Sequence, residues 1–164
     1  MTIREQLERD ELDFGIVILS DASSNLQLLP MTRNQIVACV PEAHPLSNKD
    51  ALTINDIENV DLIMLKKGSF LRYMVLNKLK MANITPNIVL ESNQIETIKG
   101  LVSSNVGISF LLDFIVKGAK GIKPLSFAEP IYVDLGLAWK KERYISKAAQ
   151  SFIDFCKNTL NTNH

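Results

Sequence analysis

The sequence has few of the residues from which catalytic and metal sites are most often built. Among its 164 residues are two histidines, two cysteines and one tryptophan. The thiols, Cys39 and Cys156, lie far apart in the chain, so they predict neither a disulfide framework nor a cysteine-ligated metal. Both fall in apolar patterns, and we therefore expect two reduced thiols in the hydrophobic core.

The chain also lacks net charge, because 18 Lys and Arg residues balance 18 Asp and Glu residues. A nucleic-acid surface normally shows a basic excess, so charge does not draw this chain to DNA, RNA or an acidic membrane. Long apolar runs are missing too: residues 106–116 are interrupted by Asp113 and fall short of the ~20 residues of a spanning helix. A charged stretch follows Met1 with no signal peptide, which predicts a cytoplasmic protein with no membrane partner.

The common catalytic and nucleotide-binding motifs are absent as well. The sequence contains no H-E-x-x-H, no G-x-S-x-G, no P-loop and no G-x-G-x-x-G. His44 lies between Pro41 and Pro45 with no cysteine or histidine near it in sequence, so we interpret it as a turn residue rather than a metal ligand or general base. The sequence thus predicts no catalytic residue, no metal site and no cofactor.

What is present is an alternation of strand and helix patterns. Helical periodicity marks residues 3–9, 71–79 and 95–102, and Asn93 with Glu96 has the spacing of a capping box before the third of these. Ser146 is expected to cap a final helix with an inward face of Ile145, Ala149, Phe152, Ile153, Cys156 and Leu160. Apolar runs predict strands at 14–19, 26–29, 35–40, 62–65, 86–90, 106–111 and 131–139. Such alternation is typical of right-handed βαβ units on a mostly parallel sheet in an α/β protein.

The pattern predicts two lobes with a double crossing of the chain between them. Residues 41–133 carry their own set of strands and helices. Residues 1–40 and 134–164 would form the other lobe from both ends of the chain. A cleft between two such lobes is a common place for a small-molecule site.

Two predicted helix starts carry the features of an anion site. Gly68-Ser69 and Ser92-Asn93 each stand between the carboxyl end of a predicted parallel strand and a helix, the edge where open α/β sheets bind ligands. Free backbone N–H groups and the helix dipole favour an anion there, and Lys66, Lys67 and Arg72 add positive charge. The alternative is that both starts are ordinary helix caps. Residues 106–109 would form a third wall, unless Gly107 serves only close packing.

Several segments together resemble LysR-type transcriptional regulators. Residues 11–16 (ELDFGI) resemble the family stretch G-x-L-D-h-a-I, and residues 44–47 (HPLS) resemble its H-P-L-A. Glu91 with residues 98–111, and residues 137–155 around Trp139, resemble its later motifs. The motifs fall in the family's order and cover most of the chain.

The resemblance implies an effector-binding domain of two Rossmann-like lobes, similar to type II periplasmic binding proteins. It implies a small effector, which the two helix starts predict to be anionic, and a homo-oligomer, dimer or tetramer, that binds DNA only through a domain missing here. The effector-contacting positions carried over from the family are Gly68, Ser69, Phe70, Arg72, Ser92, Asn93 and Gln94. The first β-α-β stretch of the family's effector domain has no counterpart here, so we expect an N-terminally truncated chain with an incomplete first lobe.

The sequence departs from the family pattern at two positions and leaves two other functions open. Asn105 stands where the family prefers glycine, and Leu112 where it prefers proline. An enzyme on the same bilobal fold, similar to prephenate dehydratase, is one alternative, although Thr32-Arg33-Asn34 lacks the phenylalanine of the Thr-Arg-Phe signature. A solute-binding protein of a transporter is the other, and it would need an export signal.

Overall fold

The computed structural model describes residues 2–142, 144 and 146–162, which form two compact units. Unit 1 comprises residues 1–33 and 133–164, and unit 2 comprises residues 34–132. The chain therefore passes between the units twice, at Arg33–Asn34 and at Tyr132–Val133. The sequence interpretation placed these crossings at residues 40–41 and 133–134. The observed second crossing is one residue away from the predicted one. The observed first crossing lies earlier in the chain than predicted, because it falls in the middle of a long strand.

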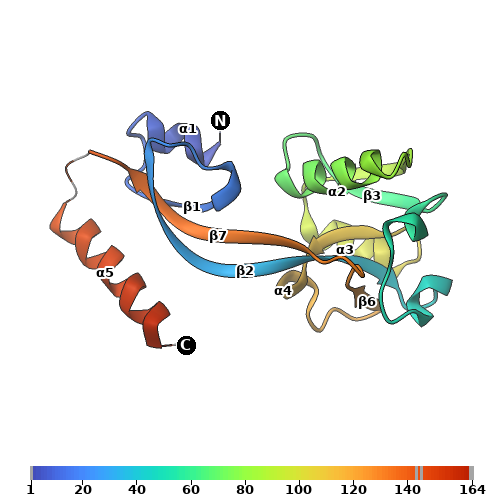
Figure 1. Ribbon diagram of the computed structural model, residues 1–164. Helices are drawn as coiled ribbons and strands as arrows, with labels where there is room; N and C mark the ends of the chain where they lie inside the picture. Colours follow the sequence, from blue (N-terminus) through green and yellow to red (C-terminus); the bar gives the residue numbers. More distant parts are fainter. Residues whose placement is uncertain (1, 143, 145, 163–164) are drawn as a thin grey trace. The chain divides into compact units, whose positions relative to one another are not determined.

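That strand is β2 (Leu26–Pro41), a single strand of 16 residues where the sequence predicted two strands separated around Pro30 and Asn34. Proline removes one N–H donor but its fixed φ suits an extended chain, so a strand can continue through it where that donor is not needed. β2 contributes its first half to unit 1 and its second half to unit 2, beside β7 (Ile131–Lys140) (Figure 1). Pro41 ends the strand and does not mark the crossing.

Unit 1 begins with α1 (Ile3–Glu8), which a capping box starts. The Glu5 N–H donates to Thr2 Oγ1 at 3.3 Å, and the Thr2 N–H donates to Glu5 Oε2 at 2.8 Å. α1 packs on β1 (Gly15–Ile18), which runs antiparallel to β7 and is followed by the short helix η1 (Leu19–Asp21). The core between α1 and the sheet contains buried Leu7, Leu26 and Ala138.

The C-terminal helix α5 (Lys147–Thr162) also belongs to unit 1. Ser146 caps it as the sequence predicted, since Ser146 Oγ accepts a hydrogen bond from the Ala149 N–H at 3.2 Å. The predicted inward face is confirmed at Ala149, Ile153 and Cys156, which are buried. Phe152 is 41% exposed, although its ring stacks on Phe14 with the ring centroids 4.7 Å apart. Leu160 is half-buried, and Ile145 lies outside the described residues.

Unit 2 is the α/β unit that the sequence predicted from its strand and helix alternation. After η2 (Pro45–Asn48) and η3 (Ile54–Ile57) come β3 (Asp61–Leu65), α2 (Phe70–Met81), β4 (Asn87–Ser92) and α3 (Ile95–Ser103). β5 (Ser109–Leu112), α4 (Asp113–Val116) and β6 (Ile122–Leu125) complete it. β3 and β4 are parallel, whereas β5 and β6 are antiparallel to β2 and β1 is antiparallel to β7, so the prediction of a mostly parallel sheet is wrong.

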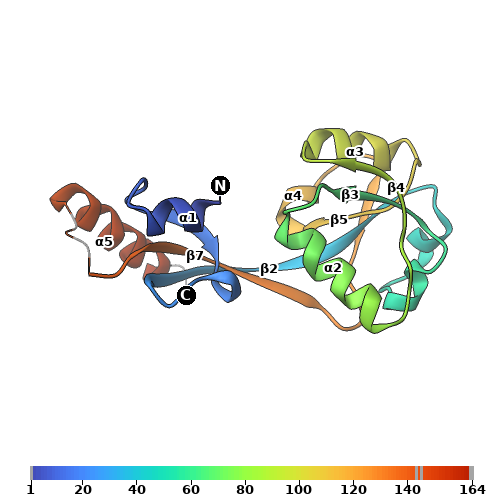
Figure 2. The ribbon, with the colours of Figure 1, turned by 90° about the horizontal axis from the view of Figure 1, so that it is seen from above.

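The core of unit 2 lies between α3 and the strands, and α2 covers the opposite side of β3 (Figure 2). Its buried members come from β2, β3, α3, β5, α4 and β6: Val37, Cys39, Ile63, Ile98, Val102, Leu111, Val116 and Ile122. Both cysteines are buried and free, as predicted, and burial raises the pKa of the Cys39 thiol to about 12. In the described part of the chain, no helix is both long enough and apolar enough to cross a lipid bilayer.

The structure explains why asparagine and glycine occupy positions 105 and 107 in the turn before β5. Asn105 has φ +58°, and asparagine is one of the few residues besides glycine that tolerates this left-handed region. Gly107 lies against β3, so close that an added Cβ would be 2.6 Å from the Asp61 carbonyl oxygen. Backbone approach therefore requires a glycine at position 107.

Gly107→Ala should destabilise the protein by about 1–3 kcal/mol, because the added methyl group forces the backbone of Asp61 to move. Gly100→Ala is the matched control: its Cβ would meet nothing within 4 Å, and in the middle of α3 alanine should stabilise by up to ~1 kcal/mol. The midpoints of urea unfolding measure both changes. Equal midpoints for the two variants would contradict the close approach.

Candidate functional site

Two loops meet at one edge of the β3–β4 pair. Because these strands are parallel and Leu65 lies opposite Ser92, both end at the same place. The backbone N–H of Lys66, after β3, donates to the side-chain oxygen Oδ1 of Asn93, after β4, at 3.2 Å. The structure therefore brings together the two segments that the sequence singled out, Gly68 to Arg72 and Ser92 to Gln94.

The first segment turns sharply into α2. Gly68 has φ +94°, a conformation that L-residues rarely adopt, and an added Cβ would meet nothing within 4 Å. Glycine is therefore needed here for its backbone and not for space. Ser69 is the N-cap: its carbonyl accepts the Tyr73 N–H at 3.1 Å, but within the described residues its hydroxyl accepts no hydrogen bond from the helix. Phe70, half-buried, is the first helical residue.

The second segment differs from the sequence prediction in its cap. Gln94 is the N-cap of α3, and the capping box predicted for Asn93 and Glu96 is wrong, because the Asn93 side chain is turned toward Lys66. Ser92 Oγ accepts a hydrogen bond from the Gln94 N–H at 3.0 Å. The Gln94 side-chain oxygen Oε1 accepts the Thr97 hydroxyl at 3.0 Å, but as at α2 the N-cap side chain accepts no hydrogen bond from a described backbone N–H of the helix it starts. Both helices thus begin with first-turn N–H groups that no cap side chain occupies.

Arg72 holds this edge together from inside. Its guanidinium donates to the Leu65 carbonyl oxygen at 2.7 Å and forms an ion pair with Glu91 at 2.7 Å, and its side chain is only 10% exposed. These contacts tie the first turn of α2 to the ends of β3 and β4. The charge that faces solvent at the edge comes instead from Lys66 and Lys67, whose side chains are exposed.

The third wall that the sequence placed at residues 106–109 is not at this edge. Ile108 pairs in parallel with Leu62, and Gly107 packs against Asp61, the first residue of β3. Residues that precede a parallel strand lie at its amino end, so this turn is at the opposite end of the sheet. Gly107 serves close packing, the alternative that the sequence left open.

The sequence did not predict a surface hollow beside the residues that follow β5 at its carboxyl end. Asp113 Oδ1 accepts the Phe114 N–H at 2.9 Å and the Gln35 N–H at 3.4 Å. These three residues and Lys117 line part of an open hollow of about 450 Å³. An acidic residue directly after an apolar run was the available signal, but it was interpreted only as a break in that run.

His44 has the structural role that the sequence predicted. It is the N-cap of η2, and its Nδ1 accepts the Leu46 N–H at 3.2 Å. Over the residues that the structure describes, no three His, Cys, Asp or Glu side chains gather in a way that could hold a metal ion.

The sequence is similar to proteins of one family along almost its whole length. The family model described as LysR substrate binding domain matches residues 1–161. The HTH-type transcriptional regulator YybE of Bacillus subtilis is 33% identical over 152 residues, which are 90% of this chain and 51% of that protein. The hydrogen peroxide-inducible genes activator of Haemophilus influenzae is 27% identical over 129 residues, 77% of this chain and 43% of that protein. The chain spans about half the length of these relatives.

Solved structures of regulatory domains have the same fold. The regulatory domain of CcmR from Synechocystis PCC6803, in complex with 2-PG, matches with a TM-score of 0.87 at 26% identity. That match covers 96% of this chain and 78% of the CcmR chain. The effector binding domain of QuiR, in complex with shikimate, matches with a TM-score of 0.85 at 28% identity, over 96% of this chain and 76% of that chain.

Arg72→Met should lower the free energy of unfolding by about 1–3 kcal/mol, because it leaves the Leu65 carbonyl and the Glu91 carboxylate without their partner. Lys99→Met is the control, since the ion pair that Lys99 forms among the described residues is a helical i,i+3 pair with Glu96, worth at most about 0.5 kcal/mol. Urea unfolding followed by circular dichroism measures both. If the two variants are equally stable, Arg72 does not hold the edge.

Proposed function

This chain belongs to the LysR substrate-binding domain family, and from that premise we propose that it senses a small anionic effector for a LysR-type transcriptional regulator. The observation that carries the proposal is the edge where β3 and β4 end. Two helices begin there side by side, and within the described chain neither N-cap side chain occupies the N–H groups of its helix.

The chemistry of this edge selects an anion. The N–H groups at a helix start and the helix dipole together attract negative charge, and two such starts can hold different oxygens of one carboxylate or phosphate. Lys66 and Lys67 add exposed positive charge beside them. We assign direct contact to the backbone and side chains of Ser69, Ser92, Asn93 and Gln94, with Gly68 and Phe70 shaping the turn. Arg72 acts through its hold on Leu65 and Glu91.

In the full-length regulator, the effector would act by population shift. It stabilises whichever state of the domain binds it better, and thereby one arrangement of DNA-binding domains in a homo-oligomer. Such a regulator works where the DNA is, in the cytoplasm. The effectors in the CcmR and QuiR structures support a small-molecule ligand for this chain as well. The proposal is one of binding, without a catalytic step.

Thiol chemistry is a weaker explanation of sensing here, although one relative is a hydrogen peroxide-inducible genes activator. A redox-sensing cysteine needs an accessible thiolate with a lowered pKa. Cys39 and Cys156 are both buried, and the pKa of Cys39 is raised to about 12. We therefore propose ligand binding rather than oxidation as the signal.

Ser69→Asp should abolish effector binding without unfolding the protein. An aspartate at the N-cap occupies the first-turn N–H groups of α2 and repels an anion, while as a helix cap it is as good as serine. A panel of small carboxylates and phosphates, shikimate among them, is screened by thermal shift. A ligand at 100 times its dissociation constant adds about 2.7 kcal/mol to the wild-type protein and should add nothing to the variant.

Ser146→Asp is the matched control, because it makes the same change at the N-cap of α5 in the other unit. It should keep the full ligand-induced shift. The proposal is wrong if Ser69→Asp and Ser146→Asp respond to the same anion equally, or if no anion of the panel stabilises the wild-type protein.

A further inference from the structure

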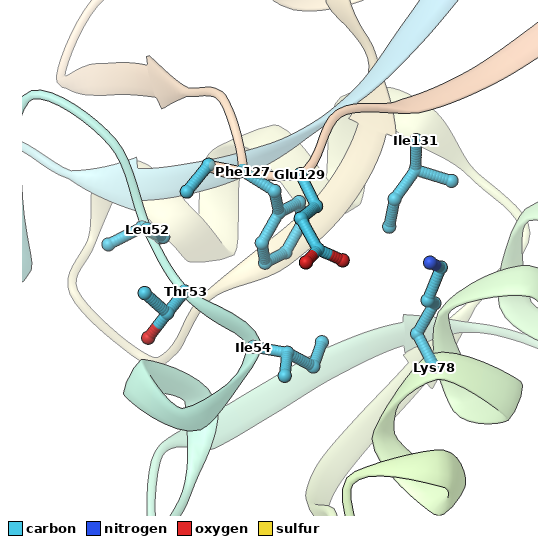
Figure 3. Close-up of a pocket in the computed structure, with 8 residues that line it drawn as sticks. Leu52, Thr53, Ile54, Lys78, Phe127, Glu129 and Ile131 are labelled. Atoms are coloured by element: carbon cyan, nitrogen blue, oxygen red, sulfur yellow. The ribbon is translucent and has the colours of Figure 1, made fainter.

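Unit 2 contains a second pocket, formed by residues away from the β3–β4 edge. It has a volume of about 200 Å³, and all of its lining residues belong to unit 2. They come from the start of η3 and the two residues before it, from the second half of α2, and from the segment between β6 and β7 with the first residue of β7 (Figure 3). The lining includes four apolar side chains and two charged ones: Leu52, Ile54, Phe127, Ile131, Lys78 and Glu129.

The apolar floor of this pocket is fixed by the backbone. The Leu52 N–H donates to the Ser126 carbonyl at 2.9 Å, and the Ala128 N–H donates to the Leu52 carbonyl at 2.7 Å. The Phe127 ring stacks against Phe110 with centroids 6.0 Å apart. Leu52 and Phe127 are buried, so the floor is already formed before any ligand arrives, which lowers the entropic cost of binding.

Two side chains of opposite charge lie beside this apolar floor. Figure 3 shows the Glu129 carboxylate reaching into the pocket from the β6–β7 segment and the Lys78 amino group rising toward it from α2. Among the described residues, neither side chain makes a hydrogen bond or an ion pair, including with the other. The only other polar side chain in the lining, Thr53, is engaged with Asp56 at 3.1 Å.

We propose that this pocket binds a zwitterionic amino acid with a branched apolar side chain, such as leucine. The ligand carboxylate pairs with Lys78, its ammonium group pairs with Glu129, and its side chain packs on Phe127, Leu52, Ile54 and Ile131. A plain anion would meet Glu129 and a plain cation would meet Lys78, so only a ligand with both charges satisfies both groups. The volume of about 200 Å³ is below the ~300–1,000 Å³ of pockets for drug-sized ligands and suits a metabolite of this size.

Three related probes test the assignment of each charge: L-leucine, 4-methylpentanoate, which lacks the ammonium group, and leucinamide, which lacks the carboxylate. Binding is measured by titration calorimetry at pH 6.5, where an α-amino group is protonated. Lys78→Met should weaken leucine and 4-methylpentanoate about tenfold, which is about 1.4 kcal/mol, and should tighten leucinamide, because it removes the positive charge that repels this cation. Glu129→Gln should weaken leucine and leucinamide about tenfold and should tighten 4-methylpentanoate, because it removes the negative charge that repels this anion.

Lys80→Met and Glu58→Gln are the matched controls, since both residues are exposed charges of the same unit outside the pocket lining. Both should bind leucine as the wild-type protein does. Ser69→Asp should also bind leucine normally, so failure of the anion site and failure of this pocket are separable. The inference is overturned if the dissociation constant of leucine is weaker than about 10 mM, which corresponds to a binding free energy of about −3 kcal/mol. It is equally overturned if the Lys78 and Glu129 variants match the controls.

Discussion

The candidate site depends on one constraint, the parallel and in-register pairing of β3 with β4. Leu65 opposite Ser92 means that both strands stop at the same level, so the helices that follow them start next to each other. Neither loop could form the edge alone, because each supplies only one helix start. Antiparallel pairing would have placed the two starts at opposite ends of the pair.

The distribution of charge at this edge follows from the same pairing. Arg72 can reach both the Leu65 carbonyl and the Glu91 carboxylate only because the strand ends are level, and this contact neutralises its charge inside the protein. What remains for a ligand is the partial charge of backbone N–H groups and the exposed lysines. Backbone donors are fixed in direction, whereas lysine side chains are mobile and strongly hydrated. In the anion site that we propose, selectivity would therefore depend on backbone geometry, and Lys66 and Lys67 would contribute mainly attraction.

The sequence predicted this edge because its signals are local. The stripe of Leu71, Val75 and Leu79 fixes α2, the stripe of Ile98 and Val102 fixes α3, and the apolar runs before them fix the strands. What it could not predict depends on tertiary contacts. The Asn93 side chain had two possible partners, the start of α3 and the loop after β3, and only the folded protein shows that Lys66 is the one. Likewise Pro30 suggested a break in a strand that neighbouring β7 holds continuous.

The prediction that residues 106–109 form a third wall was wrong for a different reason, the direction of the strand that they begin. Residues 106–109 contain a glycine and a serine, as the Gly68-Ser69 loop does, but they lie at the amino end of β5 and do not follow its carboxyl end. In a parallel arrangement this difference moves a loop from one edge of the sheet to the other. The order of strand and loop along the chain therefore carries more information about a binding edge than the composition of the loop.

α2 connects the proposed anion site to the proposed amino-acid pocket, and its packing decides how the two could influence each other. Lys78 stands eight residues after Phe70, about 12 Å along the helix. Arg72 ties the first turn to the strand ends, and buried Val75 and Leu79 pack the rest against the core, so a tilt of α2 relative to β3 would break these contacts. A ligand in one site can change affinity at the other only by changing the population of a state in which α2 and β3 move together. Because such coupling is reciprocal, an amino acid that tightened anion binding would itself be bound more tightly by the same factor in the presence of the anion.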